Sequence, residues 1–164
     1  MRKILTATLA AGLLTAGAAH AATATTTFAV TATVNSTCAT TATALAFPAY
    51  TPGAGAVTQS STVSVKCTKN TPYTVKLDGG VGGTVAQRAM TSGANTLQYQ
   101  LYTTVGLGTV WGDGTGSSVT QAGVGAGVAT ANTLTVFGQV PDSAFNQGVV
   151  PASYTDTVTV TVSY

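Results

Sequence analysis

Few side chains of this sequence could act as an acid, a base or a nucleophile. Its 164 residues include one histidine, two cysteines, four aspartates and no glutamate. The histidine, His20, lies in an amino-terminal segment that we expect to be removed, and without it a Ser–His–Asp or Cys–His site has no base. The usual zinc sites need histidines or several cysteines, and the supply of both is too small. The sequence therefore predicts a protein that is not an enzyme, with no catalytic residues, no metal and no cofactor.

The four aspartates are the remaining candidates for acid–base chemistry, because a pair of carboxylates could supply a general acid and a general base. They are Asp78, Asp113, Asp142 and Asp156. All four are far apart in the sequence, and none lies in an Asp-Thr-Gly or Asp-Ser-Gly context. We therefore do not expect a paired-carboxylate site.

The amino terminus has the pattern of a secretory signal peptide. The first three residues are a short basic start, and residues 4–18 are apolar with small side chains. The small-x-small pattern at residues 19–21 predicts cleavage after Ala21. A membrane anchor is the alternative, but the apolar run is short for a bilayer span. We expect export and a mature chain of 164 − 21 = 143 residues, enough for one domain.

The charge that remains after cleavage is balanced. The remaining cations are Lys66, Lys69, Lys76 and Arg88. They match the four aspartates in number, so the formal net charge falls from +2 to zero. Basic patches with interleaved aromatic residues, typical of nucleic-acid-binding proteins, are absent from the sequence. The glycine clusters at 79–83 and 123–128 lack the lysine and the following helix of a phosphate-binding loop. We expect loops between strands there, and neither a nucleic acid nor a small-molecule substrate.

Cys38 and Cys67 are two cysteines in a chain that we expect to reach an oxidising compartment. A single disulfide between them is the economical interpretation, and two free thiols are the alternative. The disulfide would close a loop of 67 − 38 = 29 residues. It would stabilise the fold by roughly 3–4 kcal/mol in the chain-entropy model.

Short runs of alternating apolar and polar residues cover much of the chain and indicate β-strands. No segment has a convincing helical period, and glycine, proline, serine and asparagine separate the runs. The expected strands are residues 28–34, 44–50, 61–67, 73–77, 96–103, 133–140 and 157–164. This number and spacing of short strands predicts an all-β sandwich of immunoglobulin-like type in one domain.

Several motifs in a fixed order resemble one known family. The motifs are FAVTATVNSTC (28–38), STVSVKCTKNTPYTVKLDGG (61–80), LQYQLYTT (97–104), VWGDG (110–114), LTVFGQVP (134–141) and YTDTVTVTVSY (154–164). Together with the signal peptide, they closely resemble the spore coat protein U domain family, which includes the Csu-type pilins of the archaic chaperone–usher pathway. The resemblance covers essentially all of the mature chain.

This resemblance implies an incomplete immunoglobulin-like β-sandwich that lacks its last strand. The N-terminal donor strand of a neighbouring subunit would complete it, by strand addition at an exposed edge. The implied organisation is a signal peptide (1–21), a donor strand (22–34) and a pilin, or spore coat U, domain (35–164). The inserting donor positions would be Phe28, Val30, Ala32 and Val34. The acceptor groove would be lined in part by Val158, Val160, Val162 and Tyr164.

The function implied is that of a structural pilin subunit. Such subunits polymerise by donor-strand exchange into an extracellular fibre for surface attachment and biofilm formation. The implied partners are identical subunits in a head-to-tail fibre, together with a periplasmic chaperone and an outer-membrane usher during assembly. The chain would be exported through the periplasm to the cell surface. Since 143 residues leave no room for a second, receptor-binding domain, we favour a shaft subunit, the major one, over a tip adhesin.

Two other functions remain open. Within the same family, the chain could assemble by the same polymerisation into a coat around a spore or cyst. Outside it, a secreted monomeric carbohydrate-binding β-sandwich would present aromatic residues on one face and pair residues 28–34 within its own chain. Against this second possibility, we expect Tyr99, Tyr102 and Trp111 to lie in the core or at its edge.

Overall fold

The computed structural model describes residues 20–164, in two units that divide after Thr33. Residues 20–33 are exposed and contain no helix or strand. The expected signal peptide, residues 1–21, falls outside the described residues except for its last two, so it stays a prediction. From residue 20 onward, no helix is long and apolar enough to cross a membrane.

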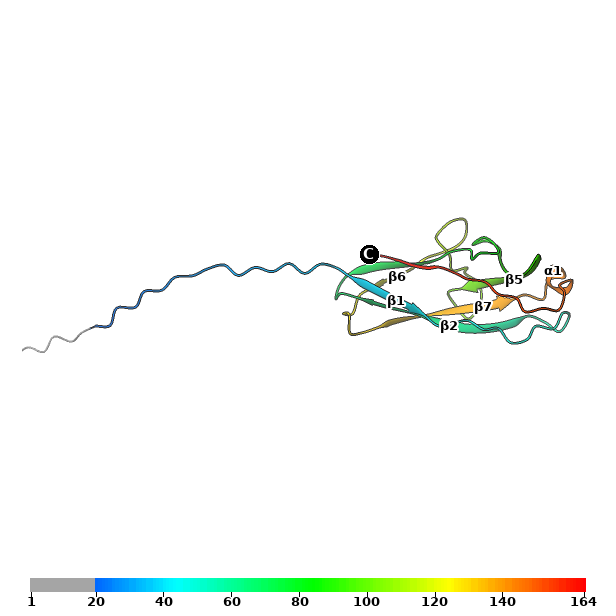
Figure 1. Cartoon of the computed structure of the whole chain (residues 1–164), viewed down its shortest axis with the longest axis horizontal. Helices are drawn as coiled ribbons and strands as arrows, with labels where there is room; N and C mark the ends of the chain where they lie inside the picture. The colour runs from blue at the N-terminus through cyan, green and yellow to red at the C-terminus, as the bar shows by residue number, and fades with distance from the viewer. Residues whose placement is uncertain (1–19) are drawn as a thin grey trace, which may run out of the picture. The chain divides into compact units, whose positions relative to one another are not determined.

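The second unit, Val34–Tyr164, consists of two antiparallel sheets (Figure 1). Its strands are β1 (Cys38–Ala42), β2 (Val57–Cys67), β3 (Pro72–Leu77), β4 (Arg88–Ser92), β5 (Asn95–Tyr102), β6 (Gln121–Val124), β7 (Asn132–Val140) and β8 (Val160–Ser163), and a single turn of helix, α1, covers Ala144–Gln147. The five-stranded sheet has the order β1-β2-β7-β5-β4, and the three-stranded sheet has the order β6-β3-β8. The predicted all-β class, with two antiparallel sheets, is confirmed.

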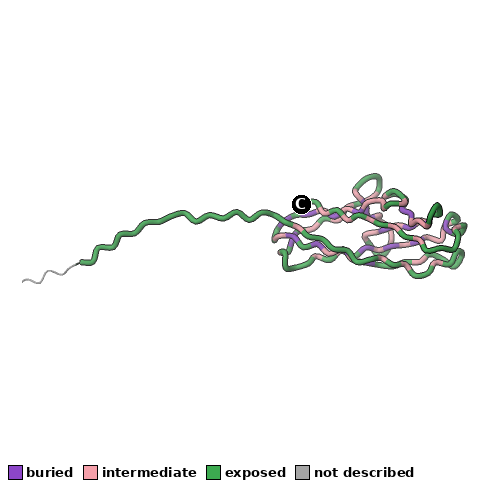
Figure 2. Tube along the Cα trace, in the orientation of Figure 1, coloured by how far each residue is buried: buried purple, intermediate pink, exposed green. Residues whose placement is uncertain are grey.

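The core is filled by the alternating apolar residues of the central strands. Its fully buried members include Val63, Val65, Val75, Leu77, Trp111 and Val140. Trp111 is wholly buried, and its indole N–H donates a 3.2 Å hydrogen bond to the backbone oxygen of Val75, which satisfies its only polar atom. In Figure 2 the buried residues fall mainly on the strands, whereas the loops are largely exposed.

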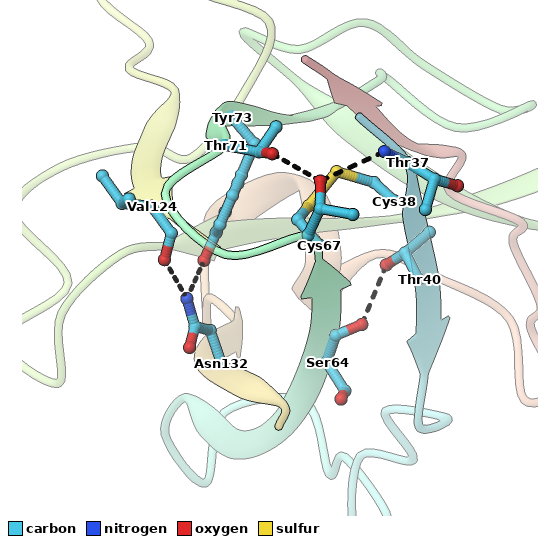
Figure 3. Close-up of a disulfide and its surroundings, with 10 residues drawn as sticks. Thr37, Cys38, Thr40, Ser64, Cys67, Thr71, Tyr73, Val124 and Asn132 are labelled. Atoms are coloured by element: carbon cyan, nitrogen blue, oxygen red, sulfur yellow. Dashed lines mark hydrogen bonds between the residues drawn. A yellow bond between two sulfur atoms is a disulfide. The ribbon is translucent and has the colours of Figure 1, made fainter. Parts of the chain in front are cut away.

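Cys38 and Cys67 form a disulfide that joins the first residue of β1 to the last residue of β2, with their Cα atoms 4.1 Å apart (Figure 3). The predicted pairing is confirmed, and the free-thiol alternative is wrong. Near it, the Asn132 amide of β7 donates to the Tyr73 hydroxyl on β3 and to the Val124 oxygen on β6. The disulfide therefore fixes the first strand of the domain near the point where the Asn132 side chain connects the two sheets.

Four of the expected strands, 61–67, 73–77, 96–103 and 133–140, correspond to β2, β3, β5 and β7. The last expected strand, 157–164, is shorter as observed, because only Val160–Ser163 pairs with β3. Residues 44–50 are not a strand, since Pro48 lacks an N–H and the segment has no ladder partner. Residues 28–34 form no strand with their own chain.

Three strands were not predicted from the sequence, because their residues do not alternate apolar with polar. They are β1 (CATTA), β4 (RAMTS) and β6 (QAGV). Since β6 includes Gly123 and Val124, the expectation of a loop over 123–128 is wrong for these two residues.

The helix α1 extends the β5–β7 ladder at the point where a proline interrupts it. The β5–β7 register would place Gln98 opposite Pro141, which has no N–H to donate. The buried Asn146 side chain replaces the missing backbone: it accepts from Gln98 N at 2.9 Å and donates to Gln98 O at 2.9 Å. It also donates to Pro141 O at 2.7 Å. This contact fixes the position of the next residue, Asp142.

Candidate strand-binding groove

β1 and β8, like β4 and β6, are terminal strands that pair on one side only. β1 pairs with β2, β8 pairs with β3, and the two strands contact each other. Their other edges have no ladder partner within residues 20–164. Backbone N–H and C=O groups along such an edge are available to an added strand.

Between the chain segments next to these edges lies a groove made of two adjoining hollows of about 580 and 540 Å³. One wall is residues 42–52, which begin at the last residue of β1, and we call it the β1-side wall. The other is residues 149–160, which lead into β8, and we call it the β8-side wall. Leu45, Phe47, Met90 and Tyr154 line both hollows, so the hollows lie next to each other.

The floor of the groove is apolar and comes from both sheets. It is formed by Val63, Leu77, Met90, Leu97, Tyr99, Leu101, Val136 and Val140. Among all the residues that line the two hollows, Asp156 is the only charged one. An extended segment with one apolar face is the ligand that this lining suits, since every second side chain would enter the groove.

The β1-side wall packs closely on the floor because Gly138 has no side chain. A Cβ atom at Gly138 would lie 2.8 Å from Phe47 Cζ and 2.9 Å from Leu45 Cδ1. Phe47 packs edge-on against Tyr99, with ring centroids 6.2 Å apart. Residues 44–49 form no backbone hydrogen bond with any part of the chain that the structure describes, so side chains alone hold this stretch.

The far end of the β1-side wall is held by the Asp142 carboxylate. Its Oδ1 accepts hydrogen bonds from the Tyr50 hydroxyl, at 2.5 Å, and from Gly53 N, at 3.0 Å. Its Oδ2 accepts from Gly55 N at 3.0 Å. The hydrogen bonds from Tyr50 and then Gly53 lower the pKa of Asp142 below its usual value, so the carboxylate is charged at neutral pH.

The β8-side wall is held by backbone pairing and by two carboxylates. Thr155 and Thr91 exchange two backbone hydrogen bonds, of 2.8 and 3.0 Å. Thr159 N donates to the Asp78 carboxylate at 2.8 Å, and Asp78 N donates back to Thr159 O at 3.1 Å. These contacts leave the groove-facing edge of the wall unpaired.

Asp156 lies on the β8-side wall and connects it to the groove floor. Its Oδ2 accepts a 2.7 Å hydrogen bond from the hydroxyl of Tyr99. Its Oδ1 accepts from Val81 N and from Thr157 N, both at 2.7 Å. Burial and the Asp156 carboxylate together raise the pKa of Tyr99, so its hydroxyl remains a donor.

Of the four residues expected to line an acceptor groove, two line the second hollow and two do not. Val158 and Val160 line the groove. Val162 packs against the core beside it, and Tyr164 is 60% exposed and does not contribute to the lining. Most of the lining, including Leu45 and Phe47, was not predicted from the sequence, although the alternation in 44–50 could have indicated these two residues.

The expected donor positions are exposed in a single chain. Phe28, Val30 and Val34 are 85%, 83% and 88% exposed, and Ala32 is exposed as well. Of the aromatic residues expected in the core or at its edge, Tyr99 and Trp111 are buried and Tyr102 is half-buried.

The groove contains no arrangement that could perform acid–base or metal chemistry. Over residues 20–164, no three histidine, cysteine or acidic side chains gather where they could hold a metal ion. Its one carboxylate, Asp156, is engaged by three donors. What this geometry can do is bind an extended apolar segment.

The model of the Spore Coat Protein U domain family matches residues 24–161. No curated protein matches the chain. Among solved structures, the chain is similar to the crystal structure of the CsuC–CsuE chaperone–tip adhesion subunit pre-assembly complex from archaic chaperone–usher Csu pili of Acinetobacter baumannii. The identity is 25% and the TM-score 0.53, over 80% of this chain and 41% of that one. The chain thus spans less than half the length of the protein it matches.

Proposed function

The chain belongs to the Spore Coat Protein U domain family, and from this premise we propose that it is a structural pilin subunit that polymerises by donor-strand exchange. The N-terminal segment of one copy, residues 22–34, fills the apolar groove of the next copy. The result is a head-to-tail fibre, exported through the periplasm to the cell surface, that mediates surface attachment and biofilm formation. The observation that carries the proposal is the pair of adjoining hollows with an apolar floor between the β1-side wall and the β8-side wall.

The groove and the donor segment, residues 22–34, are chemically complementary. Residues 28–34 place Phe28, Val30, Ala32 and Val34 on one face and carry no charge, and the groove floor is apolar except for Ser61. Burying Phe28, Val30 and Val34 would contribute roughly 1.5–3 kcal/mol each. Backbone hydrogen bonds to residues 44–49, which have no backbone partner among the described residues, would add to this. Such a contact is heterologous and does not close, so it generates a fibre.

A periplasmic chaperone and an outer-membrane usher are the partners we propose for assembly. The matching solved structure is a complex between a chaperone and a pilus subunit. The chaperone would occupy the groove of each subunit until the donor strand of the next copy replaces it. Within the fibre we propose a shaft position, the major one, for this chain.

The test is a denaturing gel of the purified assembly, loaded unboiled and boiled. We expect a ladder of multiples that collapses to one band on boiling. A variant with Val30→Asp and Val34→Asp should form no ladder, because both side chains enter the groove. The matched control carries Thr31→Asp and Thr33→Asp, which change the opposite face of the same segment, and should still form one. A folded, soluble protein that runs as a monomer in every lane would contradict the proposal.

A further inference from the structure

Three of the four aspartates in the domain hold the walls of the groove. Asp142 binds the end of the β1-side wall, whereas Asp78 and Asp156 bind the β8-side wall. The fourth, Asp113, accepts hydrogen bonds only within its own loop, from the backbone N–H and the hydroxyl of Thr115, at 2.9 and 2.6 Å. Three of only four carboxylates therefore lie at the walls of one groove, which suggests that they serve a common purpose there.

The carboxylates connect segments that are distant in the sequence. Asp142 is 92 residues from Tyr50 and 89 from Gly53, and Asp156 is 57 residues from Tyr99 and 75 from Val81. A carboxylate that accepts from backbone N–H and hydroxyl groups forms charge-assisted hydrogen bonds, which are stronger than neutral ones. Each aspartate therefore replaces the ladder contacts that its wall lacks.

The hydrophobic effect favours closure of an empty groove of this kind. Its floor is apolar, and water in contact with it favours any movement of the walls that covers the floor. Residues 44–49 of the β1-side wall have no backbone hydrogen bonds to resist such a movement. The contacts of Asp142 with residues 50–55 and of Asp156 with Tyr99 and Val81 hold the two walls to fixed parts of the fold.

We propose that Asp142 and Asp156 are positioning residues that keep the two walls of the empty groove apart. The groove is then preorganised, and an incoming strand binds without first reopening it. This inference rests on the proposed function, because the occupant is residues 22–34 of another copy. It goes beyond that function in assigning groove opening to two carboxylates that the donor strand itself does not need to contact.

The experiment measures how fast a labelled peptide of residues 22–34 binds to acceptor chains. Every acceptor is the full exported chain with Val30→Asp and Val34→Asp, so that it can accept a strand but cannot donate one. Fluorescence anisotropy gives the association rate for this acceptor and for versions that also carry Asp142→Asn, Asp156→Asn or Asp113→Asn. We expect the first two to slow association by about tenfold, since each weakens hydrogen bonds to a charged group. Asp113→Asn is the matched control and should bind at the unchanged rate.

Unfolding temperatures of the empty and the peptide-filled acceptors separate groove positioning from general stability. Asp142→Asn and Asp156→Asn should lower the unfolding temperature of the empty form more than that of the filled form, since the bound strand then holds the walls. Equal lowering in both forms, with association rates unchanged, would overturn the inference. Should either variant fail to fold, Tyr50→Phe and Tyr99→Phe remove one hydrogen bond from Asp142 and Asp156 respectively, and the same slowing is expected.

The two proposals fail in different ways. Peptide binding at one common rate to all acceptors would refute the role of the carboxylates and leave donor-strand exchange intact. No binding to any acceptor, the Asp113→Asn control included, would refute the proposed function and this inference with it.

Discussion

Phe47 packs edge-on against Tyr99, with ring centroids 6.2 Å apart, where the two hollows of the groove meet. Phe47 comes from the β1-side wall and Tyr99 from the floor, so this aromatic pair sets how closely the wall approaches the sheet. The approach is possible because the floor position beneath it is Gly138, where a Cβ atom would lie 2.8 Å from Phe47 Cζ. The shape of the groove therefore depends on a missing side chain.

Gly138→Ala should impair strand binding more than folding. The new methyl group displaces Phe47 and Leu45, whose side-chain ends can move, toward the space that the donor strand would occupy. We expect a loss of about 1–3 kcal/mol of stability from this overpacking, and a loss of affinity for a peptide of residues 22–34. Gly106→Ala is the control, since a Cβ atom there has no neighbour within 4 Å. Unchanged peptide affinity in Gly138→Ala would show that the wall does not limit the groove.

Removing the disulfide should destabilise the domain without changing its fold. The bond closes a 29-residue loop between β1 and β2, and the chain-entropy model assigns it roughly 3–4 kcal/mol. Cys38→Ala with Cys67→Ala avoids burying a hydroxyl at Cys67, which is almost fully buried. Urea unfolding of the double variant should give a free energy of unfolding lower by about that amount. Equal unfolding curves would mean that the β1–β2 ladder alone fixes the start of the domain.

The strands that could be predicted from the sequence are those whose residues alternate in burial. In β2, Val63, Val65 and Cys67 face the core while the residues between them face away, and a period of two shows this pattern directly. β1, β4 and β6 are short, and their sequences carry no such alternation. β1 and β6 are strands because distant segments pair with them, and such pairing leaves no local signal, whereas β4 pairs with the adjacent β5 across a two-residue loop.

The groove was predictable in part for the same reason. Alternation predicted one apolar face through Val158 and Val160, which line the second hollow. It could not indicate the roles of Asp142 and Asp156, because their donors lie 57 to 92 residues away along the chain, apart from Thr157. Their spacing argued against acid–base chemistry, and only the folded chain shows that they hold backbone segments instead.

Acid should destabilise the β1-side wall, with Asp142 as one of the groups responsible. Hydrogen bonds from Tyr50, Gly53 and Gly55 lower the pKa of Asp142 below its usual 3.8. A carboxyl group with a lowered folded-state pKa stabilises the fold fully above about pH 3.8, and this contribution disappears as the pH falls through the folded value. Urea unfolding at decreasing pH should therefore show a smaller acid loss in Asp142→Asn than in the unchanged protein. Parallel acid profiles would contradict the assignment.

Alkali should weaken the hydrogen bond between Tyr50 and Asp142, because it removes the proton of the Tyr50 hydroxyl. Burial, the hydrogen bond to Asp142 and the charge of that carboxylate raise the pKa of Tyr50 from 10.0 to about 12. The unfolded chain loses this proton near pH 10, so the stabilisation is complete below pH 10 and is lost as the pH rises toward about 12. The tyrosinate absorbance of the unchanged protein minus that of Tyr50→Phe isolates this titration from the other tyrosines. In Asp142→Asn the difference should titrate closer to 10, because the neutral amide no longer opposes ionisation. A Tyr50 titration that stays in place after this substitution would show that burial alone holds the proton, and that the hydroxyl does not depend on Asp142.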